Sequence, residues 1–498
     1  MDLFHNLIFG FGVALSLQNL LYCLIGVTVG TLIGVLPGIG PLGTIAILMP
    51  ITYSIAPVGA LIMLAGIYYG AQYGGSTTAI LVNLPGETSA VVTCIDGYQM
   101  ARQGRAGPAL AIAAIGSFFA GTVGTLLIAL FGPPLADVAL KFGSPEYFSL
   151  MLMGLVAAAV LAQGDMVKSL AMVVTGLLLG LVGSDVNTGV QRFSFGFPEL
   201  SDGIGFVVVA VGVFAIGEII TNLGDKEERR VFTATVTSLF PSKEDMKRSI
   251  GPILRGTGIG SFFGVLPGTG PAIASFASYM LEKKLAADPS RFGRGAIEGV
   301  AAPESANNAD AQCKFIPMLT LGLPASGVMA LMLGALTIQG IQPGPEVMTQ
   351  RPELFWGLIA SMWIGNLMLV VLNLPMIALW VKLLQVPYRL LFPAIMAFSA
   401  IGIYSVNNSS FEIYLTALFG LFGFICMKLG FPPAPLLLGY VLGPMMEENL
   451  RRSMLMSGGD PSVFVTRPIS LAFIVATALI LVVMILPAVR QRRLEIAD

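Results

Sequence analysis

A twelve-residue motif that occurs twice constrains this chain more than any other feature. Residues 30–41 read Gly-Thr-Leu-Ile-Gly-Val-Leu-Pro-Gly-Ile-Gly-Pro, and residues 260–271 repeat eight of the twelve positions. An apolar helix must stop at this motif, because proline lacks the N–H group and glycine permits conformations closed to other residues. Broken helices at matching positions of two halves are typical of the binding site of a secondary transporter.

The composition predicts an all-α polytopic membrane protein. The chain has 498 residues, of which 55% are hydrophobic and 11% charged. Residues 6–86 contain no charged residue and no histidine, whereas one span needs only about 20 apolar residues. From this and the later charge-free runs we expect about ten to twelve transmembrane helices, together with broken or re-entrant segments.

Charge and metal-ligating residues exclude several function classes. A net charge of −1 gives no sign of nucleic-acid binding. The four cysteines are isolated, and His5 is the only histidine, so we expect no disulfide framework, no zinc site and no organic cofactor. The N-terminus lacks the basic region of a signal peptide, and we expect a retained helix there.

The repeated motif divides the chain into two membrane repeats, residues 1–222 and 253–498, joined by a charged cytoplasmic linker at 223–252. The loop after the second motif is basic, whereas its first-half counterpart at 53–59 has no basic residue; the basic residues are Lys283, Lys284, Arg291 and Arg294. Short cytoplasmic loops collect lysine and arginine. Equivalent loops are therefore expected on opposite sides of the membrane, which predicts an inverted repeat.

Polar residues inside apolar sequence mark a candidate site in the first half. Ser76, Thr77, Thr78 and Asn83 precede a second Leu-Pro-Gly break. Each hydroxyl could instead bond to a carbonyl of its own helix. Their clustering favours a polar lining.

The second-half counterpart, residues 298–327, is more polar. It carries Asn307, Asn308, Lys314, Thr320 and Ser326. Charges at mid-membrane need partners, water or a ligand. Three alternatives stay open: a cytoplasmic helix over 298–314, helix capping by either asparagine, and a lysine that reaches the membrane surface.

These motifs resemble the large membrane subunit of bacterial tripartite tricarboxylate transporters, the TctA type. The resemblance rests on both Gly-Val-Leu-Pro-Gly motifs, on Tyr-Gly-Gly-Ser-Thr-Thr at 73–78, and on Ala-Pro-Glu-Ser-Ala-Asn-Asn-Ala at 302–309. It implies uptake of citrate-like carboxylate anions across the inner membrane, driven by a cation gradient. It also implies two partners, a small membrane subunit and a periplasmic binding protein. The charged stretch from Asp310 to Lys314 departs from the family pattern.

We expect the substrate and a coupling cation, Na⁺ or H⁺, to bind between the halves. Helix N-termini after the breaks offer free N–H groups to a carboxylate, and freed carbonyls near Gly38 and Gly268 could bind Na⁺. The other residues of the two helix breaks that we expect in this site are Pro37, Gly40, Pro267 and Gly270. A membrane-embedded enzyme that uses Glu298, Glu304 and Asp310 is the rival interpretation, and a channel is a third.

Overall fold

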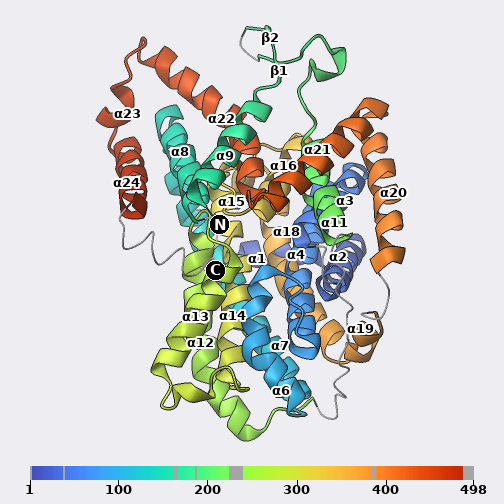
Figure 1. Cartoon of the computed structure of the whole chain (residues 1–498). Coiled ribbons are helices and arrows are strands. Elements are labelled where there is room, and N and C mark those ends of the chain that lie inside the picture. The colour runs from blue at the N-terminus through green and yellow to red at the C-terminus, as the bar shows by residue number, and fades with distance from the viewer. Residues whose placement is uncertain are drawn as a thin grey trace.

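The computed structural model describes residues 3–36, 40–161, 165–185, 188–223, 239–383 and 388–485, which are almost entirely helical (Figure 1). The first helices are α1 (Leu3–Ala14), α2 (Leu17–Val35), α3 (Pro41–Leu48), α4 (Pro57–Val82), α5 (Val91–Thr93), α6 (Gln99–Arg102), α7 (Ala106–Ala139), α8 (Ser144–Leu161), α9 (Met166–Gly180), α10 (Phe206–Ala210) and α11 (Gly217–Leu223). The strands β1 (Gly183–Ser184) and β2 (Gln191–Arg192) pair antiparallel and project at one end of the molecule.

The later helices complete the bundle. They are α12 (Lys243–Val265), α13 (Pro271–Leu285), α14 (Glu298–Cys313), α15 (Phe315–Leu321), α16 (Gly327–Ile338), α17 (Glu346–Gln350), α18 (Pro352–Asn373), α19 (Ile377–Leu383), α20 (Tyr388–Asn407), α21 (Ser410–Lys428), α22 (Ala434–Met456), α23 (Val463–Thr466) and α24 (Pro468–Ile485). Short 3₁₀ or π turns connect them: η1 (Met49–Ser54), η2 (Thr88–Ala90), η3 (Cys94–Tyr98), η4 (Pro198–Leu200), η5 (Val211–Ile216) and η6 (Pro289–Arg291).

The distribution of apolar side chains is that of a membrane protein. Among the described residues, four helices are long and apolar enough to span a bilayer, namely α2, α7, α18 and α21. Shorter apolar helices accompany them, among them α9 and α16. Large apolar side chains point outward, such as Phe131 at 58% exposure and Ile401 at 62%, as expected where lipid rather than water surrounds the protein.

The first motif interrupts a helix, as predicted. α2 ends at Val35 and α3 begins at Pro41. Glycines of α2 lie directly against the backbone of α4, with Gly26, Gly30 and Gly34 facing Met63, Ile67 and Ala71. The residue numbers of the paired positions rise together along the two helices, so α2 and α4 run parallel. α3 and η1 therefore lead the chain back to the level at which α2 began, which makes α2 and α3 a helical hairpin.

The second motif builds the same arrangement. α12 ends at Val265 and α13 begins at Pro271. Glycines of α12 lie against the backbone of α14, with Gly256, Gly260 and Gly264 facing Ala302, Ala306 and Asp310. Small residues let membrane helices approach closely and gain van der Waals contact. The predicted linker at 223–252 lies partly in α12, since this helix begins at Lys243, and residues 224–238 lie outside the described residues.

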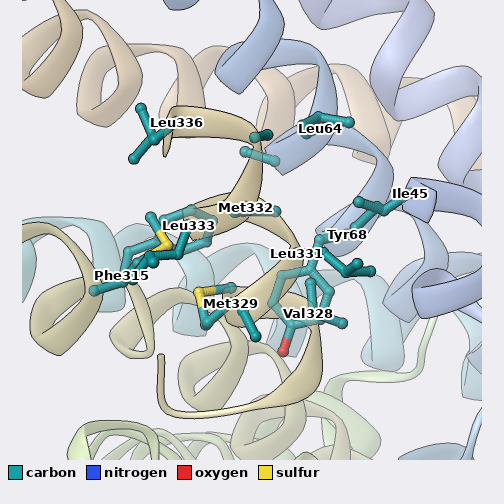
Figure 2. Close-up of a cluster of buried hydrophobic side chains, with 14 of the residues drawn as sticks. Ile45, Leu64, Tyr68, Phe315, Val328, Met329, Leu331, Met332, Leu333 and Leu336 are labelled. Carbon is teal, nitrogen blue, oxygen red and sulfur yellow. The ribbon is translucent and has the colours of Figure 1, made fainter. Parts of the chain in front are cut away.

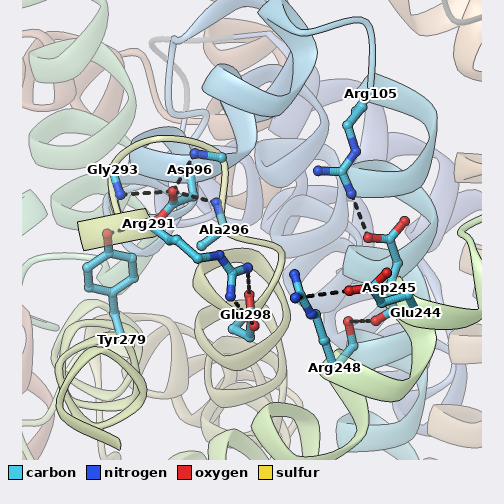
Figure 3. Close-up of polar contacts among 12 residues, drawn as sticks. Asp96, Arg105, Glu244, Asp245, Arg248, Tyr279, Arg291, Gly293, Ala296 and Glu298 are labelled. Carbon is cyan, nitrogen blue, oxygen red and sulfur yellow. Dashed lines mark hydrogen bonds and ion pairs between the residues drawn. The ribbon is translucent and has the colours of Figure 1, made fainter. Parts of the chain in front are cut away.

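A buried aspartate joins the first half to the base of the second hairpin (Figure 3). Asp96 accepts hydrogen bonds from the backbone N–H groups of Gly293, Gly295 and Ala296 at 2.8–2.9 Å, and from the Tyr279 hydroxyl at 2.9 Å. The next residue, Gly97, packs against Ile80 near the end of α4. The end of α4 thus lies at the base of the α12–α13 hairpin, which is the end opposite its Pro-Gly break. The start of α4 lies at the base of the α2–α3 hairpin.

Basic residues gather at this same end. Arg105 pairs with Asp245 at 2.5 Å, and Arg291 pairs with Glu298 at 3.1 Å (Figure 3). The Gln103 side chain donates to the carbonyl of Arg294 at 2.8 Å. The basic loop after α13 and the start of α12, which the sequence predicts to be cytoplasmic, therefore both lie beside the turn at Gln103 and Arg105.

The main apolar core contains residues from both halves of the sequence (Figure 2). Ile45, Leu64 and Tyr68 of α3 and α4 pack beside Phe315 and the side chains of α16. Interiors of this kind are close-packed, so a change of volume on one element is felt by its neighbours. The broken helices are consequently held in place by the packing of both halves.

Candidate functional site

A cavity of about 440 Å³ lies where four helices begin. Its wall contains the starts of α3 at Gly40, α13 at Gly270, α16 at Ser326 and α22 at Pro433. The first N–H groups of a helix have no partner within that helix, and the helix dipole places roughly half a positive charge at this end. The cavity therefore concentrates the features that bind anions.

Both hairpins contribute to the cavity at their breaks. Gly268 has φ +82°, a conformation that favours glycine, and it packs against the backbone of Ala157 and Ala158, which leaves no room for a side chain. Its N–H group donates to the carbonyl of Ala325 at 3.0 Å. Gly270 differs, since a Cβ atom there would meet no atom of the described residues within 4 Å. The predicted residues Pro37 and Gly38 lie outside the described residues.

Acidic and amide side chains complete the cavity wall. Glu218 of α11 accepts a hydrogen bond from the backbone N–H of Gly40 at 3.3 Å. Gln72 of α4 is 1% exposed, and its Nε2 atom has no hydrogen-bond partner. Glu87 follows the Leu-Pro-Gly break after α4 and also lines the cavity. Sequence reasoning missed these three residues; Glu87 and Glu218 each end a long charge-free run, which is a signal that could have identified them.

A polar network lies behind the cavity, along α14. Glu304 accepts hydrogen bonds from the hydroxyls of Ser76, at 2.5 Å, and of Thr93. Asn308 donates to the Ser117 hydroxyl at 2.7 Å and to the carbonyl of Glu304 at 3.0 Å. The network therefore links α14 of the second half to α4, α5 and α7 of the first.

Asn307 connects this network to the cavity wall. Its Nδ2 donates to Glu87 at 3.2 Å, and its buried Oδ1 has no partner among the described residues. Both asparagines lie inside α14 rather than at its start, so the helix-capping alternative is wrong. The cytoplasmic-helix alternative is also wrong, because residues 299–313 are buried.

Lys314 forms a fully buried ion pair with Asp310, and neither side chain is exposed. The alternative in which Lys314 reaches the membrane surface is therefore wrong. The second Asp310 oxygen, Oδ1, is buried and has no hydrogen-bond partner within the described part of the chain. Lys314 itself does not line the cavity.

The other predicted site residues have local roles in the structure. Three hydroxyls donate to carbonyls of their own helices, from Thr77 to Tyr73, from Thr78 to Gly75 and from Thr320 to Ile316. Asn83 ends α4 in the left-handed conformation at φ 57°. Ser326 caps α16, since its hydroxyl accepts from the N–H of Met329 at 3.4 Å. Only Ser326 of these five lines the cavity.

The three carboxylates of the enzyme alternative do not converge. Glu298, Glu304 and Asp310 are each six residues apart on one helix, which is about 9 Å along its axis. Each has a separate partner: Arg291, the Ser76 and Thr93 hydroxyls, and Lys314. Within the described ranges, no group of three His, Cys, Asp or Glu side chains could hold a metal ion.

Comparison with known proteins agrees with this architecture. The sequence profile of the tripartite tricarboxylate transporter TctA family matches residues 20–438. A protein of Agrobacterium vitis, described as an uncharacterized 52.8 kDa protein in the TAR-I ttuC' 3' region, is 59% identical over 99% of this chain and 98% of its own length. An uncharacterized protein in the TAR-II ttuC' 3' region of the same organism is 58% identical over 47% of this chain and 97% of its own length. No solved structure matches the chain. With its broken helices enclosing one cavity and this profile match over most of its length, the chain belongs to the TctA family, the large membrane subunits of tripartite tricarboxylate transporters.

Proposed function

We propose that this protein imports tricarboxylate or dicarboxylate anions, such as citrate, across the bacterial inner membrane, driven by a gradient of Na⁺ or H⁺. The observation that carries the proposal is the cavity on which the N-termini of α3, α13, α16 and α22 converge. The positive dipole ends of four helices suit a ligand with more than one carboxylate. The predicted site residues Gly40, Gly268, Gly270 and Ser326 would contact this substrate.

The acidic side chains of the same cavity favour ion coupling. Glu87 and Glu218 line its wall, and among the described residues neither has a basic partner within ion-pair distance. Like charges repel strongly where water is scarce. A multiply charged anion is therefore bound favourably only when cations enter with it, and this requirement is the physical basis of symport.

The two hairpins support an inverted repeat of residues 1–222 and 253–498. α4 runs parallel to α2 and reaches the base of the α12–α13 hairpin at Gly97. The hairpins consequently approach one cavity from opposite ends. Rocking of one repeat against the other would open the cavity to each side in turn, as in other transporters with this architecture.

The family implies the partners. A tripartite system combines the large subunit with a small membrane subunit and a periplasmic protein that delivers the substrate. The exposed apolar side chains of α20 and α21, such as Ile401 and Leu418, leave surface for lipid or for another membrane subunit. We propose no cofactor besides the coupling ion.

Uptake by proteoliposomes tests this function. The protein, with its small membrane subunit and binding protein, should accumulate labelled citrate or a related acid when an inward Na⁺ or proton gradient is imposed. A channel cannot accumulate its solute against an electrochemical gradient, and an enzyme would release a chemically altered product. Equilibration without accumulation, or conversion of the acid, would contradict the proposal.

A further inference from the structure

Two oxygen atoms of α14 have no assigned role and lie near Glu87. Glu87 lines the cavity and accepts from the Ser89 hydroxyl and from Asn307 Nδ2, the latter at 3.2 Å. Asn307 Oδ1 and Asp310 Oδ1 are both buried and lack a hydrogen-bond partner among the described residues. Asn307 and Asp310 are three residues apart on α14, so their side chains are neighbours on one helix face. The charges of Glu87 and Asp310 are close enough to interact.

The orientation of the Asn307 amide follows from its neighbour. Its NH₂ group donates to the Glu87 carboxylate, and turning the amide over would instead bring Oδ1 against a negative oxygen. Oδ1 is thereby left as an acceptor. A buried acceptor without a partner costs about 1 to 3 kcal/mol. Both unpartnered atoms are oxygens, and a metal cation beside the Glu87 carboxylate would supply the positive partner that they lack.

This region is also short of positive charge. The Glu87 carboxylate lies close enough to those of Glu304 and Asp310 for their charges to interact, and among the described residues the ion pair of Lys314 is with Asp310. Lys314 binds one Asp310 oxygen and leaves the other available. Glu304 is held by the hydroxyls of Ser76 and Thr93. One further cation beside Glu87 would reduce the imbalance.

We propose that Glu87, Asn307 and Asp310 bind one alkali cation, for which Na⁺ is the probe. This inference rests on the proposed function, because it places the coupling ion of the transporter. It moves the ion from the backbone carbonyls near Gly38 and Gly268 to the side chains of Glu87 and of two residues on α14. Hard oxygen ligands suit such a cation.

The position of Glu87 explains how the ion would be linked to the substrate. This side chain belongs both to the cation site and to the cavity wall. A cation bound there neutralises the carboxylate that otherwise repels an anion in the cavity. Each ligand thereby strengthens the binding of the other, and this coupling is reciprocal.

Equilibrium binding of ²²Na⁺ to the purified full-length protein tests the site without any transport step. Choline balances the ionic strength, and the substrate is omitted. Wild-type protein should bind Na⁺ saturably and should gain thermal stability as Na⁺ rises. Glu87→Gln and Asn307→Leu should each weaken binding by about tenfold or more. Glu298→Gln removes a carboxylate from the same helix but far from the cavity, and it should bind Na⁺ like the wild type.

The outcomes separate this inference from the proposed function. Absence of saturable Na⁺ binding by the wild type would overturn the inference, while accumulation driven by a proton gradient would still support the transport function. Wild-type affinity in a correctly folded Glu87→Gln or Asn307→Leu protein would place the ion elsewhere. Saturable Na⁺ binding that needs Glu87, in a protein that accumulates no carboxylate, would retain the site and contradict the function.

Discussion

The Glu304 carboxylate accepts a hydrogen bond from the Ser76 hydroxyl at 2.5 Å, although 228 positions separate the two residues in the sequence. This contact joins α14 to α4 and thus one half of the chain to the other. Thr93 donates to the other carboxylate oxygen. Two hydroxyl donors hold a buried acid that has no basic partner among the described residues.

Removal of the Ser76 hydroxyl should therefore destabilise the protein. Ser76→Ala leaves one oxygen of Glu304 without its donor, and we expect a loss of about 1 to 3 kcal/mol in the free energy of unfolding. Thr78→Val is the matched control, since Thr78 donates only to the Gly75 carbonyl of its own helix. It should cost about 1 kcal/mol or less. Denaturant unfolding in detergent measures the free energy of unfolding of both variants. Equal losses would show that the contact with Glu304 stabilises the protein no more than a hydrogen bond within one helix.

The Asp310–Lys314 pair should show strong non-additivity. Either Asp310→Leu or Lys314→Met alone leaves one charge buried without its partner, at a cost of about 3 to 5 kcal/mol. The double substitution removes both charges and should cost far less than the sum. Unfolding of the three variants in Na⁺-free buffer gives the coupling energy. Additive losses would mean that the two charges are not coupled in the folded protein.

The glycine contacts of the second hairpin predict a difference between two neighbouring positions. Gly260 faces the backbone of Ala306, whereas a side chain at Gly258 would meet nothing within 4 Å. Gly260→Ala should destabilise the protein by about 1 to 3 kcal/mol, because α12 and α14 must separate. Gly258→Ala should be neutral or slightly stabilising, since alanine favours a helix. Similar thermal stability of the two variants would argue against close packing of these helices.

Membrane orientation can be tested with two exposed alanines. Ala287 lies in the basic loop between α13 and α14, and Ala56 lies directly before α4. In a background without the four native cysteines, an impermeant thiol reagent applied to intact spheroplasts should label Ala56→Cys but not Ala287→Cys. This result follows from the positive-inside rule. The reverse pattern would invert the whole orientation, and labelling of both would refute the opposed arrangement of the hairpins.

The helix breaks could be predicted from sequence because their cause is local. Proline and glycine end a helix whatever surrounds it, and α2 and α12 end within the motifs. The buried polar segment was also predictable, since charges in an apolar chain require partners. Asn307 and Asn308 lie in it as expected, and both are buried.

The hydrogen-bond partner of each polar side chain could not be predicted in this way. A hydroxyl such as that of Thr77 can bond to its own helix or to a distant acid. The choice depends on the side chains that pack beside it, and the sequence alone does not give that packing. Glu87 and Glu218 each follow a charge-free run, and an isolated charge at such a position normally marks water. In the structure they line the cavity, where backbone and amide donors take the place of water.

The cavity between the broken helices is the proposed substrate site. Gly270 tests this proposal directly, because its backbone is extended and a Cβ atom there would meet no described atom within 4 Å. Gly270→Leu should fill part of the cavity without disturbing the packing, while Gly258→Leu adds the same side chain to an exposed position of α12.

The decisive measurement is gradient-driven carboxylate uptake by proteoliposomes that contain either variant together with the partner subunits. We expect Gly270→Leu to unfold at the wild-type temperature but to lose nearly all uptake, whereas Gly258→Leu should transport normally. Wild-type uptake by a folded Gly270→Leu protein would contradict the assignment of this cavity as the substrate site.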